Sequence, residues 1–144
     1  MAPRNAAQAY ARVGLETGVI AANPHRLVLM LFDGALCAVA DADMCMAQGC
    51  IADKGKAISR AISIINDGLS ASLDQAHGGR IAGYLLELYD YMSRKLLHAS
   101  LNNDRAALLE VTQLLGELRA SWAAIGDAAT QAVAAPAALR HAAA

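Results

Sequence analysis

The chain of 144 residues is long enough for one domain with a continuous core, and its hydrophobic content of 56% excludes a disordered protein. Its net charge is −1, and its 12 Lys and Arg residues are scattered along the chain, which argues against nucleic acid or an anionic membrane surface as a partner.

Neither a targeting segment nor a membrane span is evident in the sequence. Residues 1–23 lack the apolar stretch of a secretory signal, and the most apolar run, 27–32, is far too short to span a membrane. The three cysteines, Cys37, Cys45 and Cys50, show no C-x-x-C spacing, and their odd number does not suggest a disulfide framework. We therefore expect reduced packing thiols, no zinc site and a soluble cytosolic protein.

The first 22 residues carry only a weak helical pattern and are expected to form an arm or a short extra helix. The first strong helix signal is Asn23-Pro24, because Asn is a good N-cap and Pro favours the first helical position. This helix is expected to run to Gln48 and to end at Gly49.

Three further helices follow from apolar stripes at helical spacing. They are expected over 56–73, from the Gly78-Gly79 break to about residue 101, and from the turn at 102–104 onward. The stripes are Ile58, Ile62, Ile65, Leu69 and Leu73; then Leu85, Tyr89, Met92, Leu96 and Ala99; then Leu108, Val111, Leu115, Leu118, Trp122 and Ile125.

Short turns and the absence of period-two alternation predict an all-α, antiparallel four-helix bundle. The bundle domain is expected over 23–125, and residues 126–144 form an Ala-rich flexible tail. Tyr89 is expected to pack in the core and Tyr91 to lie nearer a surface, because they point about 200° apart on a helix. Trp122 is expected to be structural.

Several apolar residues remain after the stripes are assigned to the core. Any one of them could fill a bundle flank or close a homodimer, but as a set they suggest an apolar groove that binds a partner. The candidates from helical geometry are Ile64, Leu86, Tyr91, Leu97, Leu109 and Leu114.

The residue sets that catalysis and metal binding need are missing. Asp33 and Asp90 have no nearby His or nucleophile to complete a catalytic set. A di-iron bundle needs Glu-x-x-His pairs, and none of the glutamates is followed by His at that spacing. The four histidines also lack ligand spacing. We expect no catalytic residue, no metal and no cofactor.

Several stretches together resemble one known family. They are AYARV at 9–13, NPHRLVLMLFDGAL at 23–36, the 56–74 region, LYDYM at 88–92, and the closing Trp122. In order and spacing they resemble the flagellar secretion chaperone family, FliS, over roughly residues 9–122. The second and fourth stretches are similar to that family's two strongest signatures.

This resemblance implies a four- or five-helix bundle that binds the C-terminal segment of newly made flagellin in the cytosol. Such a chaperone prevents premature polymerisation and helps deliver flagellin to the export gate of the flagellar type III secretion apparatus. The alternative is a self-associating structural bundle without a client, and a homodimer in the absence of client stays open.

The resemblance also adds two partner-binding residues, Tyr10 and Val13. They match the family's N-terminal arm, which covers part of the groove in the empty chaperone. Many relatives place a bulky apolar residue where this chain has Ala7, so the covering contact is expected to be weaker here. We expect the arm to be mobile without client.

Overall fold

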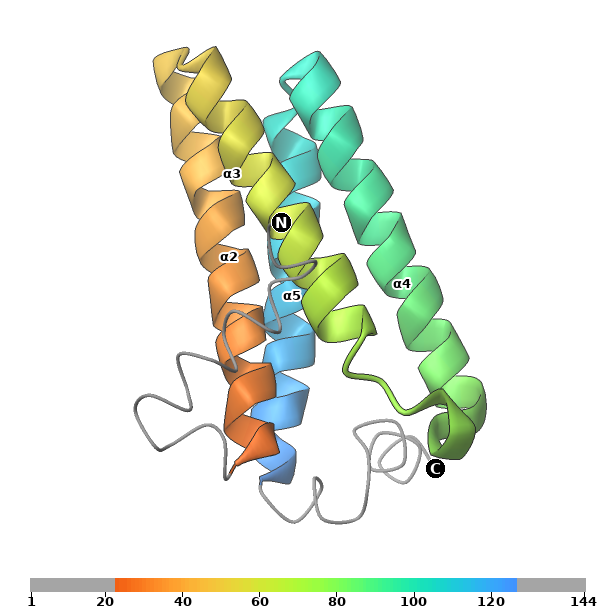
Figure 1. Cartoon of the computed structure of the whole chain (residues 1–144). Coiled ribbons are helices and arrows are strands. Elements are labelled where there is room, and N and C mark those ends of the chain that lie inside the picture. The colour runs from red at the N-terminus through yellow and green to blue at the C-terminus, as the bar shows by residue number, and fades with distance from the viewer. Residues whose placement is uncertain (1–22, 127–144) are drawn as a thin grey trace, which may run out of the picture.

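The computed structural model describes residues 23–126, apart from the side chains of residues 75 and 77, and contains four helices and no strand within that range (Figure 1). The prediction of an all-α bundle is confirmed. The predicted arm, with Tyr10 and Val13, and the tail beyond Gly126 lie outside the described residues. The division of the chain into arm, bundle and tail therefore stays a prediction.

Helix α2 (Pro24–Gln48) begins and ends where the sequence predicts. The Asn23 side chain accepts a hydrogen bond from the Arg26 N–H at 3.1 Å, and Pro24 occupies the first helical position. At the other end Gly49 has a φ of 77°, the left-handed conformation that glycine adopts without a Cβ clash.

Helix α3 (Ile51–Ser63) begins before residue 56, where the apolar stripe placed its start. The Cys50 N–H bonds to the Cys45 carbonyl at 2.9 Å and closes α2, while the Lys54 N–H bonds to the Cys50 carbonyl at 2.9 Å. One residue thus ends one helix and starts the next. The stripe missed this first turn because its residues are mostly exposed.

The end of α3 continues as a π-helical segment, η2 (Ile64–Ser70). The Ile64 N–H still bonds to the Arg60 carbonyl in the α-helical manner, and both Ile64 and Ile65 face the core. Ile64 is only 1% exposed. The prediction that Ile64 points away from the core is therefore wrong, because the buried face of α3 follows Ala57 and Ala61 rather than Ile62, which is only half-buried.

Gly68 lets η2 approach α2 closely. A Cβ built on Gly68 would lie 2.9 Å from Cδ2 of the fully buried Leu31. Glycine in a helix costs about 1 kcal/mol relative to alanine, so this contact explains why the position holds no side chain.

The last two helices are α4 (Gln75–Asn102) and α5 (Arg105–Ile125). Gly79 breaks α4 near its start, with φ 57° and ψ −133°, as the glycine pair predicts. Asp104 caps α5, since its carboxylate accepts a hydrogen bond from the Ala107 N–H at 3.2 Å.

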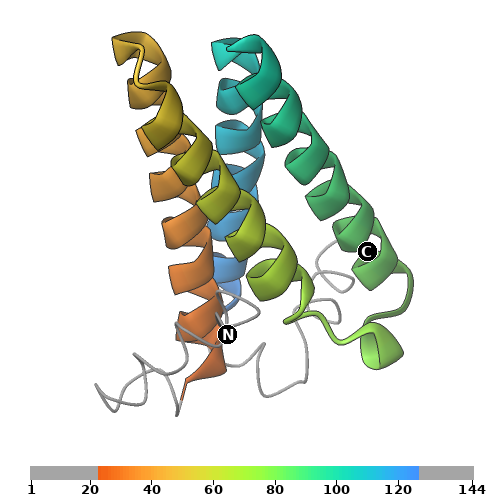
Figure 2. The same cartoon turned by 45° about the horizontal axis from the view of Figure 1, so that its top comes forward.

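The four helices surround one core. Helix α2 packs against α3 and α5, and α4 packs against α5 and against α3 with η2. Both views show α4 leaning away from the other helices toward its N-terminal end (Figures 1 and 2). Tyr89 and Trp122 are buried, as predicted. The largest fully buried side chains are Leu31, Ile64, Ile65, Leu69, Met92, Leu96, Leu108, Leu115, Val39 and Val111.

A buried lysine connects the start of α3 to the end of α4. Lys54 is 7% exposed, and its ammonium donates to the Ser100 carbonyl at 2.9 Å and to the Asn103 side-chain oxygen at 2.8 Å. Ser100 belongs to the last turn of α4, where carbonyls lack regular intrahelical donors and favour a positive charge. Lys54 therefore supplies a C-terminal cap from a neighbouring helix.

Replacing Lys54→Met should lower the free energy of unfolding by about 2 kcal/mol, because the Ser100 carbonyl loses its donor in a partly buried site. Urea denaturation measures this change. The matched control is Lys56→Met, on the exposed side of the same helix, which should change stability by no more than about 0.5 kcal/mol. Wild-type stability of the Lys54→Met variant would contradict the capping role.

Candidate partner-binding groove

The first turn of α2 and the last turn of α5 are joined by two reciprocal hydrogen bonds. The indole N–H of Trp122 donates to the His25 carbonyl at 2.9 Å, and Nε2 of His25 lies 2.8 Å from the Trp122 carbonyl. Because a carbonyl only accepts, this nitrogen carries the proton. The two rings also stack, with centroids 4.9 Å apart.

Two ion pairs connect α2 and α5 farther along. Arg105 donates to both carboxylate oxygens of Asp43, at 2.7 and 3.0 Å, and Arg119 pairs in the same way with Asp33. The hydrogen bond from Arg105 holds the pKa of Asp43 below its ordinary value. These pairs are exposed and contribute little to stability, so their main effect is to fix how the two helices align.

A hollow of about 550 Å³ lies between α2 and α5, with Asp43 and Arg105 among the residues that line it. We call it the α2/α5 groove. Leu109 on its wall is 58% exposed, so the groove presents an apolar side chain to solvent. The lining residues are Val39, Ala40, Asp43, Arg105, Ala106, Leu108, Leu109 and Thr112.

The predicted partner-binding residues do not meet in one place. Leu109 lines the α2/α5 groove. Leu97 is 54% exposed and Leu86 is half-buried, and both belong to α4, which does not line this groove. Leu114 is half-buried and packs against the core. The structure thus supports an apolar surface at Leu97 and Leu109 more strongly than at the others.

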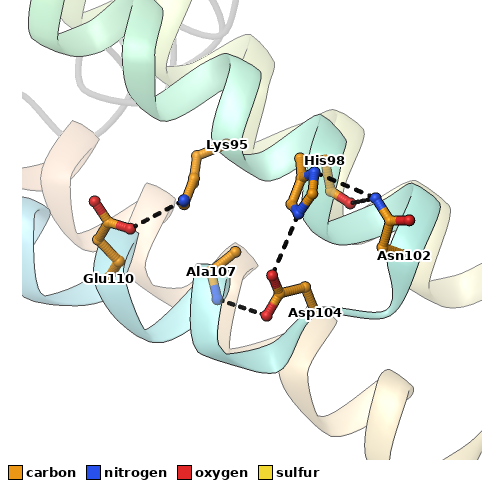
Figure 3. A network of polar contacts seen from close by, with 6 residues as sticks. All are labelled: Lys95, His98, Asn102, Asp104, Ala107 and Glu110. Carbon is orange, nitrogen blue, oxygen red and sulfur yellow. Dashed lines mark hydrogen bonds and ion pairs between the residues drawn. The ribbon is translucent and has the colours of Figure 1, made fainter.

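Tyr91 lies nearer the surface than Tyr89, as predicted, but its polar end is bound. Its hydroxyl donates to the Glu110 carboxylate. Lys95 lies 3.3 Å from the other oxygen of that carboxylate (Figure 3). The hydrogen bond from Tyr91, followed by Lys95, lowers the pKa of Glu110 and keeps it anionic. Tyr91 therefore helps join α4 to α5.

The turn between α4 and α5 is held by a second set of polar contacts (Figure 3). One oxygen of Asp104 accepts from the Ala107 N–H, and the other lies 3.3 Å from Nε2 of His98. Asn102 donates to the His98 carbonyl at 3.0 Å. Between α4 and α5 this end of the bundle is polar, whereas the α2/α5 groove is mainly apolar.

Sequence reasoning missed the α2 wall of the groove and several exposed apolar residues. Val39 is part of the core pattern and Ala40 is small, so neither stands out without knowledge that α5 lies beside them. Cys37 is exposed, and the expectation that it packs inside was wrong. The exposed apolar residues outside the predicted set are Met44, Ile51, Tyr84 and Leu101.

Within residues 23–126, no three side chains of His, Cys, Asp or Glu come together in a way that could hold a metal ion. Over the same part of the chain, no helix combines the length and the hydropathy that crossing a membrane requires.

Comparisons with known proteins match nearly the whole chain. The family model for flagellar protein FliS matches residues 6–129. The flagellar secretion chaperone FliS of Salmonella typhimurium is 49% identical over 123 residues, which cover 85% of this chain and 91% of the relative. The protein of the same name from Escherichia coli is 42% identical over 115 residues, or 80% and 85% of the two chains. FliSB of Pseudomonas aeruginosa is 42% identical over 113 residues, or 78% and 89%. The chain therefore belongs to the FliS family, which is a family of flagellar secretion chaperones and not of enzymes.

Proposed function

We propose that this chain is a cytosolic export chaperone for flagellin. It binds the disordered C-terminal segment of flagellin, prevents premature polymerisation and aids delivery to the export gate of the flagellar type III secretion apparatus. Membership of the FliS family supports the chaperone class. The structural observation that carries the proposal is the α2/α5 groove, where Leu109 stands exposed beside an apolar hollow.

The groove suits one face of an amphipathic client helix. Small side chains at Ala40 and Ala106 leave room for the client's apolar residues, and Leu108 forms a buried apolar floor. Asp43 and Arg105 place charged groups at the rim, where client polar groups can bind without burying an unpaired charge. No nucleotide is needed, because ordering of the client and burial of its apolar face supply the free energy of binding.

The volume of the α2/α5 groove is too small for it to bind the whole client segment alone. About 550 Å³ is the size of a small-molecule pocket and accommodates a few side chains, whereas coupled folding and binding buries on the order of 1,000–3,000 Å². We therefore propose that the groove anchors one client helix and that the rest of the segment continues over other faces of the bundle.

The other predicted residues fit such a wrapped client. Leu97 and Leu86 supply apolar contacts on α4, and the exposed sides of Tyr91 and Leu114 supply contacts beside α5. Ile64 is withdrawn from this set because it is buried. We also keep Tyr10 and Val13 of the N-terminal arm in the proposal, as residues that cover part of the groove until flagellin binds.

A calorimetric titration with a synthetic C-terminal flagellin segment tests the function. We expect saturable binding, a negative heat-capacity change from apolar burial, and a gain in helicity by circular dichroism as the client orders. The absence of both heat and helicity gain at high concentration would contradict client binding. Sedimentation in parallel tests the self-associating alternative, which holds if the chain is a homodimer that client does not dissociate.

The variant Leu109→Ala tests whether the groove is the anchor. It should weaken client affinity about tenfold or more, because burying a leucine contributes about 1.5–3 kcal/mol and each tenfold corresponds to about 1.4 kcal/mol. Its stability should change by no more than about 0.5 kcal/mol, since Leu109 is already exposed.

The matched control is Leu101→Ala. Leu101 is 77% exposed on α4 and does not line the groove, so its loss should leave the affinity nearly unchanged. An equal loss of affinity in the two variants would show that any exposed leucine contributes to client binding, whether or not it lines the groove. That result would contradict the proposal that the groove anchors the client.

A further inference from the structure

The turn between α2 and α3 has the hydrogen-bond pattern of a Schellman motif. The Cys50 N–H bonds to the Cys45 carbonyl at 2.9 Å, and the Gly49 N–H bonds to the Met46 carbonyl at 3.3 Å. Gly49 supplies the left-handed residue that this motif requires. In a Schellman motif the side chains of the third residue before the C-cap and of the second residue after it often contact each other, and here both of these residues are cysteines.

Both thiols are accessible and lie within electrostatic reach of each other. Cys45 and Cys50 are free and half-buried. Partial burial raises the pKa of the Cys45 thiol, and the charges of Asp53, Cys50 and Asp41 raise it further. The backbone around Cys50 is fixed on both sides, because its carbonyl also accepts from the Lys54 N–H. The backbone hydrogen bond between Cys50 and Cys45 holds the two residues side by side at the turn.

Beyond client binding, we propose that Cys45 and Cys50 form a redox-sensitive dithiol. It closes to an intramolecular disulfide across the α2–α3 turn by exchange with a low-molecular-weight disulfide such as oxidised glutathione. A C-x-x-C spacing is not needed, because the Schellman motif folds the chain back on itself and brings the first and sixth residues together.

The exchange proceeds in two steps that balance. The Cys50 thiolate attacks one sulfur of glutathione disulfide, so that a mixed disulfide forms and one glutathione thiolate leaves. Cys45 then loses its proton and attacks the Cys50 sulfur, which forms the Cys45–Cys50 bond and releases the second glutathione thiolate. The two cysteines are oxidised to a disulfide, and glutathione disulfide is reduced. The two protons that the cysteines lose pass to the two released glutathione thiolates, which become thiols.

We assign the first attack to Cys50, the residue that precedes the first turn of α3. The raised pKa of Cys45 leaves less of it as thiolate for the first step.

Cys37 provides an internal control. It is an exposed free thiol on α2, outside the Schellman turn. Exchange with oxidised glutathione should therefore leave Cys37 as a mixed disulfide with glutathione. In the Cys45–Cys50 pair, the second cysteine displaces the glutathione instead.

The experiment uses the full chain as Cys37→Ser, treated with oxidised glutathione and analysed by intact mass and peptide mapping without reduction. The expected product has lost two hydrogens, carries no glutathione and contains a Cys45–Cys50 cross-link. The double variant Cys37→Ser/Cys45→Ser should stop at one glutathione adduct on Cys50. The equilibrium constant for closure should be about tenfold higher in the folded chain than in guanidinium, because the turn holds the two thiols together.

The proposal is overturned by a persistent glutathione adduct on Cys37→Ser, by a disulfide between two chains, or by no reaction. It is also overturned if closure is no more favourable in the folded chain than in denaturant. The wild-type chain provides an independent check that needs no substitution in the pair, since mapping should find Cys45–Cys50 closed and glutathione on Cys37.

Discussion

The reciprocal hydrogen bonds between His25 and Trp122 join residues 97 positions apart and close the bundle. They bring the first turn of α2 to the last turn of α5, where the end carbonyls of a helix need donors from outside. The N-terminus of one helix then lies beside the C-terminus of the other, which is the favourable alignment of their dipoles. The α2/α5 groove lies farther along the two helices that this contact joins, beside the ion pair of Asp43 with Arg105.

The two faces of α5 differ in how they meet their neighbours. Toward α4, the Glu110 carboxylate accepts a hydrogen bond from Tyr91 and pairs with Lys95, and Asp104 lies beside His98, so polar groups line the outer edge of the contact. Toward α2, the ion pairs fix alignment but leave small or apolar side chains between the helices. Exposed apolar surface next to a hollow is typical of a binding site. This asymmetry is the physical reason to place the client anchor on the α2 side.

Local signals predicted the helix ends well, because caps at Asn23, Gly49 and Asp104 depend on a few neighbouring residues. Ile64 was misplaced because the predicted stripe was centred on Ile62, whereas the buried face of α3 follows Ala57 and Ala61, two small residues that stand out little in an apolar pattern. The groove needs two helices far apart in sequence, so Leu109 alone was visible and its partners on α2 were not. The cysteine pair likewise becomes apparent only once the Schellman hydrogen bonds are known.

The central claim is that a flagellin segment anchors in the α2/α5 groove, and methyl NMR of the wild-type chain tests it most directly. With Ile, Leu and Val methyls labelled, the C-terminal segment of flagellin is added and intermolecular NOEs are recorded. The expected result is NOEs from the client to Leu109, which lines the groove, and none to Ile51, which is 75% exposed outside it. NOEs to Ile51 and Leu97 with Leu109 unaffected would contradict the claim.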